Sequence, residues 1–390
     1  MHLPDILEIA LSKGASDIHL KVGIPPILRI NGMLWALREA PRLSPEMTKE
    51  MALLIMTERQ RERFQVNNEI DLSYSVPGLG RFRVNIFRQR GSISLALRAI
   101  PHKIPLIEEL SLPKVIENLA MEPRGLILVT GTTGSGKSTT LAAMINHINM
   151  HRNAHIITIE DPIEFLHRDK KSIINQREVG EDTNSFNSAL RVALRQDPDV
   201  IMVGEMRDVE TIETAIMAAE TGHLVMSTLH TLDAKETINR IIAVFPPFQQ
   251  DQIRIQLAAV LRGVISQRLV SRANGKGRVP AVEVLVSTAR IREYILDKSR
   301  TKDIPDAIAE GHIQYGMQTF DQSLMSLLTQ NLITYEEALN QASNRDDFAL
   351  KCRGISFTSD TKWDNFARNG EGTEKGERDI GFDQVETGFE

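Results

Sequence analysis

The first hundred residues alternate between apolar and polar positions in a way that predicts a small α/β domain. Apolar side chains recur at helical spacing over residues 4–13 and alternate with polar ones over residues 16–22, as in a half-buried strand. Asn31-Gly32 separates two apolar stretches, which is typical of a tight β-hairpin. Two more helices, beginning after Ser44 and near Thr57, and three more strands, over residues 70–76, 80–88 and 92–100, complete this domain.

The remainder of the chain predicts a second, larger α/β domain. Two prolines within residues 101–105 interrupt regular structure, and we place a linker at residues 101–112. Apolar runs at residues 126–129, 156–159, 200–203 and 224–227 then alternate with helical stretches, which predicts a parallel sheet covered on both faces. The pattern becomes mostly helical from about Pro280. We therefore expect domains at residues 1–100 and 113–353, followed by an acidic, disordered tail at residues 354–390.

The stretch between the 126–129 strand and its helix carries the clearest chemical signal. Residues 131–138 match the P-loop pattern G-x-x-x-x-G-K-[ST] at every fixed position. Glycines let backbone N–H groups turn around a phosphate, and the helix N-terminus adds its positive dipole end. We expect Lys137 to reach the β- and γ-phosphates of ATP and the Ser138 hydroxyl to bind Mg²⁺. The predicted nucleotide-binding residues are Gly131, Thr133, Gly134, Ser135, Gly136, Lys137, Ser138 and Thr139.

Acidic residues follow two other predicted strands. Glu160 and Glu164 come at the end of the 156–159 strand, and carboxylates at that edge of a parallel sheet point into the ligand crevice. Glu164 is the candidate for polarising the attacking water and Glu160 for organising the metal; a solvated acidic loop is the alternative. The 200–203 strand resembles a Walker B segment, but Gly204 stands where an aspartate is usual. The magnesium role therefore passes to Glu205, acting through water.

Two further sets of side chains are candidates for contact with the γ-phosphate. His230 follows the 224–227 strand and could sense that phosphate, although a histidine at a strand end is often structural. On the 80–88 strand, alternation changes phase at Ile86 and Phe87, which predicts a bulge or a bend. Its arginines, Arg81, Arg83 and Arg88, form either a solvated sheet face or fingers that reach the ATP of a neighbouring subunit.

Composition narrows the classes of function. The formal net charge is -5, and the last twenty residues account for all of this excess, so bulk charge does not favour nucleic acid as a partner. The single cysteine, Cys352, excludes an intramolecular disulfide and a Cys-rich zinc site. No apolar run approaches the roughly 20 residues of a membrane helix, and the N-terminus lacks signal-peptide features. We expect a cytoplasmic protein.

The order of these motifs is similar to that of the secretion ATPase superfamily. The P-loop, the acidic stretch at residues 158–164, the Walker B stretch at 199–205 and the histidine stretch at 221–230 follow one another within one hundred residues. The resemblance is strongest to the type IV pilus retraction ATPases. It implies an N-terminal PAS-like domain, a C-terminal RecA-like domain and a homohexamer. By position, Arg81, Arg83 and Arg88 match the strand whose arginines reach across subunits in this family.

The resemblance also implies partners and a location. The ring would act in the cytoplasm at the pilus base, peripherally associated with the inner membrane, and turn a membrane platform protein. An extension ATPase or a paralogous retraction ATPase would work beside it. Relatives that drive extension carry an additional N-terminal region and typically a four-cysteine zinc site, so a chain with one cysteine that starts at the PAS-like domain favours retraction.

One motif keeps other functions open. The Ala-Ile-Arg-Asn-Leu motif of retraction ATPases corresponds to residues 290–294, where only Ile291 and Arg292 match. This departure leaves room for an accessory paralogue, or for a nucleotide-gated module that docks on another pilus motor. A nucleic-acid translocase is the remote alternative. It predicts turnover that DNA or RNA stimulates and that falls steeply with salt.

Overall fold

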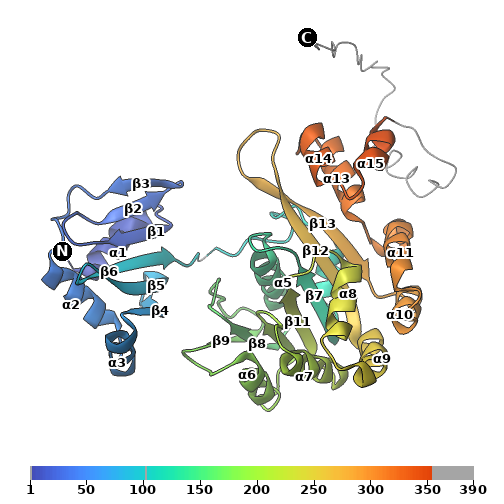
Figure 1. Ribbon diagram of the computed structural model, residues 1–390, viewed down its shortest axis with the longest axis horizontal. Coiled ribbons are helices and arrows are strands. Elements are labelled where there is room, and N and C mark those ends of the chain that lie inside the picture. Colours follow the sequence, from blue (N-terminus) through green and yellow to red (C-terminus); the bar gives the residue numbers. More distant parts are fainter. Residues whose placement is uncertain (1, 102, 354–390) are drawn as a thin grey trace, which may run out of the picture.

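The computed structural model describes residues 2–101 and 103–353 and contains two sheets, each in its own α/β domain (Figure 1). The segment after residue 100 connects them. This arrangement confirms the predicted fold class, a small N-terminal α/β domain and a P-loop domain with a largely parallel sheet. The domain limits at residues 100, 112 and 353 stay predictions, and the predicted tail at residues 354–390 lies outside the described residues.

The N-terminal domain is built on a six-stranded antiparallel sheet with the order β3-β2-β1-β6-β5-β4. Its strands are β1 (Asp17–Leu20), β2 (Ile27–Ile30), β3 (Met33–Ala36), β4 (Glu69–Val76), β5 (Gly80–Gln89) and β6 (Ser92–Ala99). Its helices are α1 (Leu3–Ser12), α2 (Pro45–Ile55) and α3 (Glu58–Asn67). Helix residues such as Ile6 and Leu7 pack against strand residues such as Ile18, Phe82 and Ile86 in one buried core.

Local sequence signals act as expected in this domain, with one exception. Asn31 and Gly32 have φ values of 49° and 82° and form the two-residue turn between β2 and β3. Ser44 caps α2 by accepting a hydrogen bond from the Met47 N–H. The predicted bulge in β5 is wrong, because the strand keeps a continuous register with both β4 and β6. Phe87 breaks the apolar alternation since it lies half-buried on the outer face.

The C-terminal domain is built on a seven-stranded sheet with the order β13-β12-β7-β11-β10-β8-β9, in which β13 alone is antiparallel to its neighbour. Its strands are β7 (Gly125–Thr130), β8 (His155–Glu160), β9 (Ile173–Glu178), β10 (Val200–Val203), β11 (Leu224–Leu229), β12 (Leu261–Ser271) and β13 (Arg278–Val286). The patterns along the sequence did not predict β9, β12 or β13. The expectation of mostly helical structure from Pro280 is therefore wrong up to Val286.

Helices cover both faces of this sheet, as the alternating pattern predicts. Those up to β12 are α4 (Val115–Ala120), α5 (Lys137–His151), α6 (Phe186–Ala193), α7 (Val209–Glu220), α8 (Ala234–Ala243) and α9 (Gln250–Val260). Those after β13 are α10 (Ala289–Leu296), α11 (Ile304–Glu310), α12 (His312–Tyr315), α13 (Phe320–Thr329), α14 (Tyr335–Gln341) and α15 (Arg345–Cys352). Short 3₁₀ turns, η1 (Pro247–Gln249) and η2 (Thr301–Asp303), precede α9 and α11.

A buried carboxyl joins β13 to the start of α8. Glu283 Oε1 accepts a hydrogen bond of 2.8 Å from the Ala234 N–H. Burial raises the pKa of Glu283 from an ordinary 4.5 to about 7; the Ala234 hydrogen bond opposes this, and Asp233 adds to it. The folded protein therefore holds this proton through a pH range in which the unfolded chain has released it.

We expect this proton to make the folded state less stable as pH rises. The unfolded carboxyl ionises near pH 4.5 and the folded one near pH 7, so the stability contributed by the protonated form is lost across that window. Between pH 5 and pH 8, urea unfolding of the full chain should lose about 2 kcal/mol more in the wild type than in Glu283→Gln. Equal pH dependence in the two proteins would show that Glu283 titrates normally.

Candidate active site

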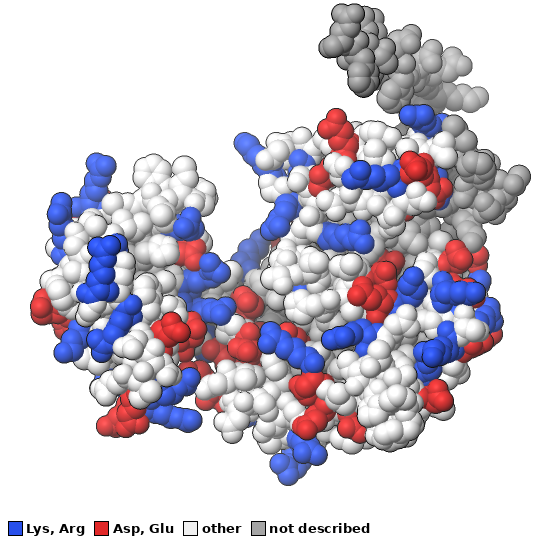
Figure 2. Space-filling model, in the orientation of Figure 1, with Lys and Arg blue, Asp and Glu red and all other residues white. Residues whose placement is uncertain are grey.

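A cleft of about 800 Å³ lies at the carboxyl edge of the parallel sheet, between the two domains (Figure 2). Residues that follow β7, β8, β10 and β11 form one wall, and residues of β5 and β6 form part of the other. Most of the residues predicted from the sequence line it, namely Arg83, Thr133, Gly134, Gly136, Lys137, Ser138, Thr139, Glu160, Glu164, Glu205 and His230.

The P-loop packs closely against β12, and this contact requires glycine at two positions of the loop. Gly131 has a φ of +140°, and a Cβ there would lie 2.4 Å from the carbonyl oxygen of Gln267. Gly136 has a φ of +94°, and its Cβ would lie 2.8 Å from Nε2 of the same glutamine. Any side chain at either position would therefore push the loop away from the strand.

The side chain of Gln267 holds the loop in place. It is buried, its Nε2 donates to the Ser135 carbonyl at 2.7 Å, and its Oε1 accepts from the Thr140 hydroxyl at 2.9 Å. One amide thus connects the P-loop to the first turn of α5. Sequence reasoning missed Gln267 because it is a single polar residue inside a strand that the patterns did not predict.

Polar groups of the loop are arranged to receive an anion. Lys137 Nζ donates to the carbonyls of Gly131 and Thr132, at 2.9 and 3.0 Å. Burial lowers the pKa of Lys137, while Glu205 acts in the opposite direction. The buried Ser135 hydroxyl has no hydrogen-bond partner within residues 2–101 and 103–353. An ammonium group, an unpaired hydroxyl and the N-terminus of α5 fit the oxygens of a nucleotide phosphate.

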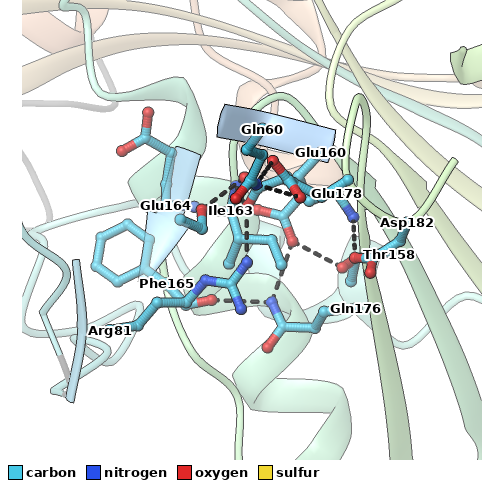
Figure 3. Close-up of polar contacts among 12 residues, drawn as sticks. Gln60, Arg81, Thr158, Glu160, Ile163, Glu164, Phe165, Gln176, Glu178 and Asp182 are labelled. Atoms are coloured by element: carbon cyan, nitrogen blue, oxygen red, sulfur yellow. Dashed lines mark hydrogen bonds and ion pairs between the residues drawn. The ribbon is translucent and has the colours of Figure 1, made fainter. Parts of the chain in front are cut away.

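The two acids that follow β8 have different environments. Glu160 is buried; its Oε1 accepts from the Thr158 hydroxyl at 2.7 Å and from Gln176 Nε2 at 3.1 Å. Its Oε2 accepts from the Glu164 N–H at 3.3 Å, and burial raises the pKa of Glu160. The Glu164 side chain is exposed and turns away from this network (Figure 3). Glu160 therefore shapes the turn, and Glu164 is the carboxylate that solvent can reach.

Glu205 lies between the Arg207 guanidinium and the His230 imidazole at the end of β10. Its Oε2 is 3.5 Å from His230 Nε2, and its Oε1 forms an ion pair with Arg207. A Cβ on Gly204 would lie 3.2 Å from the Ile159 carbonyl oxygen, so a side chain has little room at the usual Walker B position. The carboxylate at the end of β10 is therefore that of Glu205, one residue after this close approach to β8.

The three arginines of β5 have separate surroundings. Arg83 lines the cleft, Arg81 forms an ion pair of 2.9 Å with Glu178 of β9, and the Arg88 guanidinium lies over the Phe64 ring. Arg98 of β6 also lines the cleft and was not predicted. It pairs directly with Arg83 in the register of β5 and β6, so a correct alignment of these two strands would have found it.

These observations define a P-loop ATPase of the RecA-like type, with a phosphate loop after β7, acids after β8 and β10, and a histidine after β11. The family described as Type II/IV secretion system protein matches residues 2–302, and the chain belongs to this family. The protein is therefore an ATPase. This confirms the resemblance of its motifs to the secretion ATPases.

Two curated proteins and one solved structure show how far the similarity extends. The chain is 45% identical over 348 residues to the type IV pilus retraction ATPase PilT of Pseudomonas aeruginosa, covering 89% of this chain and 100% of that protein. It is 43% identical over 350 residues to the type IV pilus ATPase PilU of the same organism, covering 90% and 91%. The solved structure of the pilus retraction motor PilT with bound ADP matches with a TM-score of 0.81 at 50% identity, covering 89% and 98%.

Replacing Gln267 should weaken nucleotide binding. Gln267→Leu keeps a similar volume but leaves the Thr140 hydroxyl and the Ser135 carbonyl without their partner. We expect the dissociation constant for ADP to rise about tenfold or more, because two buried polar groups that hold the P-loop lose their partner. Isothermal titration measures it. Arg268→Ala on the same strand is the control, because its guanidinium contacts Gln341 and Phe320 instead of the P-loop. Equal ADP affinities in Gln267→Leu and the wild type would show that Gln267 does not hold the P-loop for nucleotide binding.

Proposed function

We propose that this protein is the ATP-hydrolysing motor of type IV pilus retraction, the process that drives twitching motility. The observation that carries the proposal is its match to the retraction ATPase PilT over the whole length of that protein, with the P-loop, acids and histidine gathered in one cleft. In the described part of the chain, no helix combines the length and apolar character of a membrane span. The cytoplasmic location, at the inner membrane of the pilus base, belongs to this proposal.

ATP binds with its triphosphate along the P-loop. Lys137 turns from the loop carbonyls to the β- and γ-phosphates, and the loop N–H groups and the Ser135 hydroxyl donate to phosphate oxygens. When Mg²⁺ is bound, the Ser138 hydroxyl would hold it, and Glu205 and Glu160 would orient its waters. When bound, Mg²⁺ neutralises charge on the β- and γ-phosphates.

Hydrolysis requires a water aligned with the γ-phosphate. We assign Glu164 as the group that accepts a hydrogen bond from this water and takes its proton as the oxygen attacks phosphorus. The bond from phosphorus to the β–γ bridging oxygen breaks, and ADP and phosphate leave. His230, within 3.5 Å of Glu205, is placed to report the γ-phosphate to the carboxylate that follows β10.

The motor works as a homohexamer on an inner-membrane platform protein, beside an extension ATPase or a paralogous retraction ATPase, and not on nucleic acid. Arg83 is the arginine of β5 that faces a nucleotide cleft, and it is the preferred candidate for action on a neighbouring subunit. Trans roles for Arg81 and Arg88 stay predictions. An accessory, PilU-like role is the second candidate, because the similarity to PilU is almost as high as that to PilT.

Glu164→Gln should separate binding from hydrolysis. The amide retains the size of the carboxyl but accepts no proton, so turnover should fall about 100-fold or more. Affinity for ADP should stay within about twofold, since Glu164 lies outside the phosphate loop. Phosphate release and ADP titration measure the two quantities. Glu213→Gln, at an exposed acid of α7, is the matched control. Normal turnover in Glu164→Gln would show that another group activates the attacking water.

The same variant tests the direction of the motor in the source organism. With Glu164→Gln as the only copy, abundant surface pili that never shorten would establish retraction. Loss of pili would mean that the protein drives extension. Pili and retraction that stay normal would favour the accessory role.

A trans role for Arg83 predicts rescue in mixed rings. Arg83→Ala alone should lower turnover about tenfold or more, because an arginine finger stabilises transition-state charge. Lys137→Ala subunits are inactive themselves but still carry Arg83. Mixing the two purified variants should restore part of the activity if Arg83 acts on the neighbour's ATP. Mixtures with no more activity than the sum of the two variants would place Arg83 in its own subunit's site.

A further inference from the structure

Three parts of the chain meet at the carboxylate of Glu178. This residue ends β9, the edge strand of the large sheet, and is 4% exposed. Its Oε1 accepts from the Ser73 hydroxyl at 2.6 Å, and its Oε2 accepts from Arg81 at 2.9 Å; both donors belong to the N-terminal domain. The same Oε2 also accepts from the Ile163 N–H at 3.3 Å (Figure 3). Ile163 immediately precedes Glu164.

One face of β9 holds the turn that carries Glu164. Gln176, two residues before Glu178 and so on the same face of the strand, donates to the Phe165 carbonyl at 2.9 Å and accepts from the His167 N–H at 2.8 Å. Together the two side chains fix backbone groups of residues 163, 165 and 167. The position of Glu164 therefore depends on β9, although β9 contributes no residue to the cleft lining.

The contact with the N-terminal domain is largely shielded from water. The Arg81 side chain is 20% exposed and that of Glu178 is 6% exposed. An ion pair in such surroundings is stronger and more directional than one on the surface. A second contact between the domains, from Gln60 Nε2 to Glu181 at 2.9 Å, lies nearby but does not touch the turn. The two contacts can therefore be separated by substitution.

We propose that Glu178 is a positioning residue through which docking of the N-terminal domain sets the turn that presents Glu164 to the attacking water. With the domain docked, Ser73 and Arg81 fix the carboxylate, and the carboxylate fixes Ile163. With the domain displaced, Glu178 loses two of its donors and the turn loses a fixed acceptor. Hydrolysis is thereby restricted to the docked arrangement. This inference rests on the proposed role of Glu164.

The test compares kcat for ATP with the dissociation constant for ADP in full-length variants. Arg81→Ala and Glu178→Gln should each lower kcat about tenfold or more, since small misplacements of catalytic groups cost up to about 100-fold. Ser73→Ala should have a smaller effect in the same direction, and Arg81→Lys should recover much of the activity. ADP affinity should stay within about twofold in all of them, because the P-loop is untouched.

Gln60→Ala is the matched control, as it removes the docking contact that does not reach the turn. Its kcat should stay within about twofold of the wild type. The double variant Arg81→Ala/Glu178→Gln should be no slower than the slower single variant, because both residues act through one carboxylate. If Glu178→Gln does not fold, Arg81→Ala and Ser73→Ala still carry the comparison, with Arg81→Lys as the conservative rescue.

Three results would overturn the proposal. Unchanged kcat in Arg81→Ala would remove the link to the N-terminal domain. An equal loss in Gln60→Ala would show that docking acts without Glu178. Recovery of Arg81→Ala on mixing with Lys137→Ala subunits would place Arg81 on a neighbour's ATP. Failure of the Glu164 assignment is detected separately, by normal turnover in Glu164→Gln.

Discussion

The parallel register of β7, β11, β10 and β8 is the constraint on which the rest of the site depends. Each strand ends at the same edge of the sheet, and the residue or loop directly after it supplies one chemical element of the site. The P-loop follows β7, the acidic turn follows β8, Glu205 follows β10 and His230 follows β11. No single segment contains all the residues of the site. Their relative positions therefore depend on the pairing of four strands that are distant in sequence.

The flanking strands make this edge rigid. β12 lies on one side of the four and β9 on the other, and each uses buried or half-buried polar side chains to hold one loop of the site. Gln267 clamps the P-loop, and Gln176 and Glu178 hold the acidic turn. A polar group in such a position is costly unless its partners are present. That cost favours the conformations in which both loops stay hydrogen-bonded to their flanking strands.

The sequence predicts the parts of this site that local chemistry determines. The P-loop, the Ser44 cap and the Asn31-Gly32 turn each depend on a few neighbouring residues, and their patterns suffice. β9 was missed because four of its six residues are polar, and two of these, Gln176 and Glu178, bind a turn. Glu178 and Gln267 contact residues 105 and 132 positions away, respectively. Contacts at such separations are set by strand order, which periodicity along the chain does not contain.

Residues 290–294, where the chain departs from the retraction motif, lie in α10. Ile291, which matches the retraction motif, is buried, and Tyr294 is buried in place of the motif's leucine. The Arg290 Nε donates to the Tyr294 hydroxyl at 2.7 Å, so two of the three changed positions are partners of each other. The third, Glu293, is exposed and forms an ion pair with Arg300. The changed residues are thus paired with neighbours in α10, in α11 and in the segment between them, and the ATPase fold accommodates the departure from the motif.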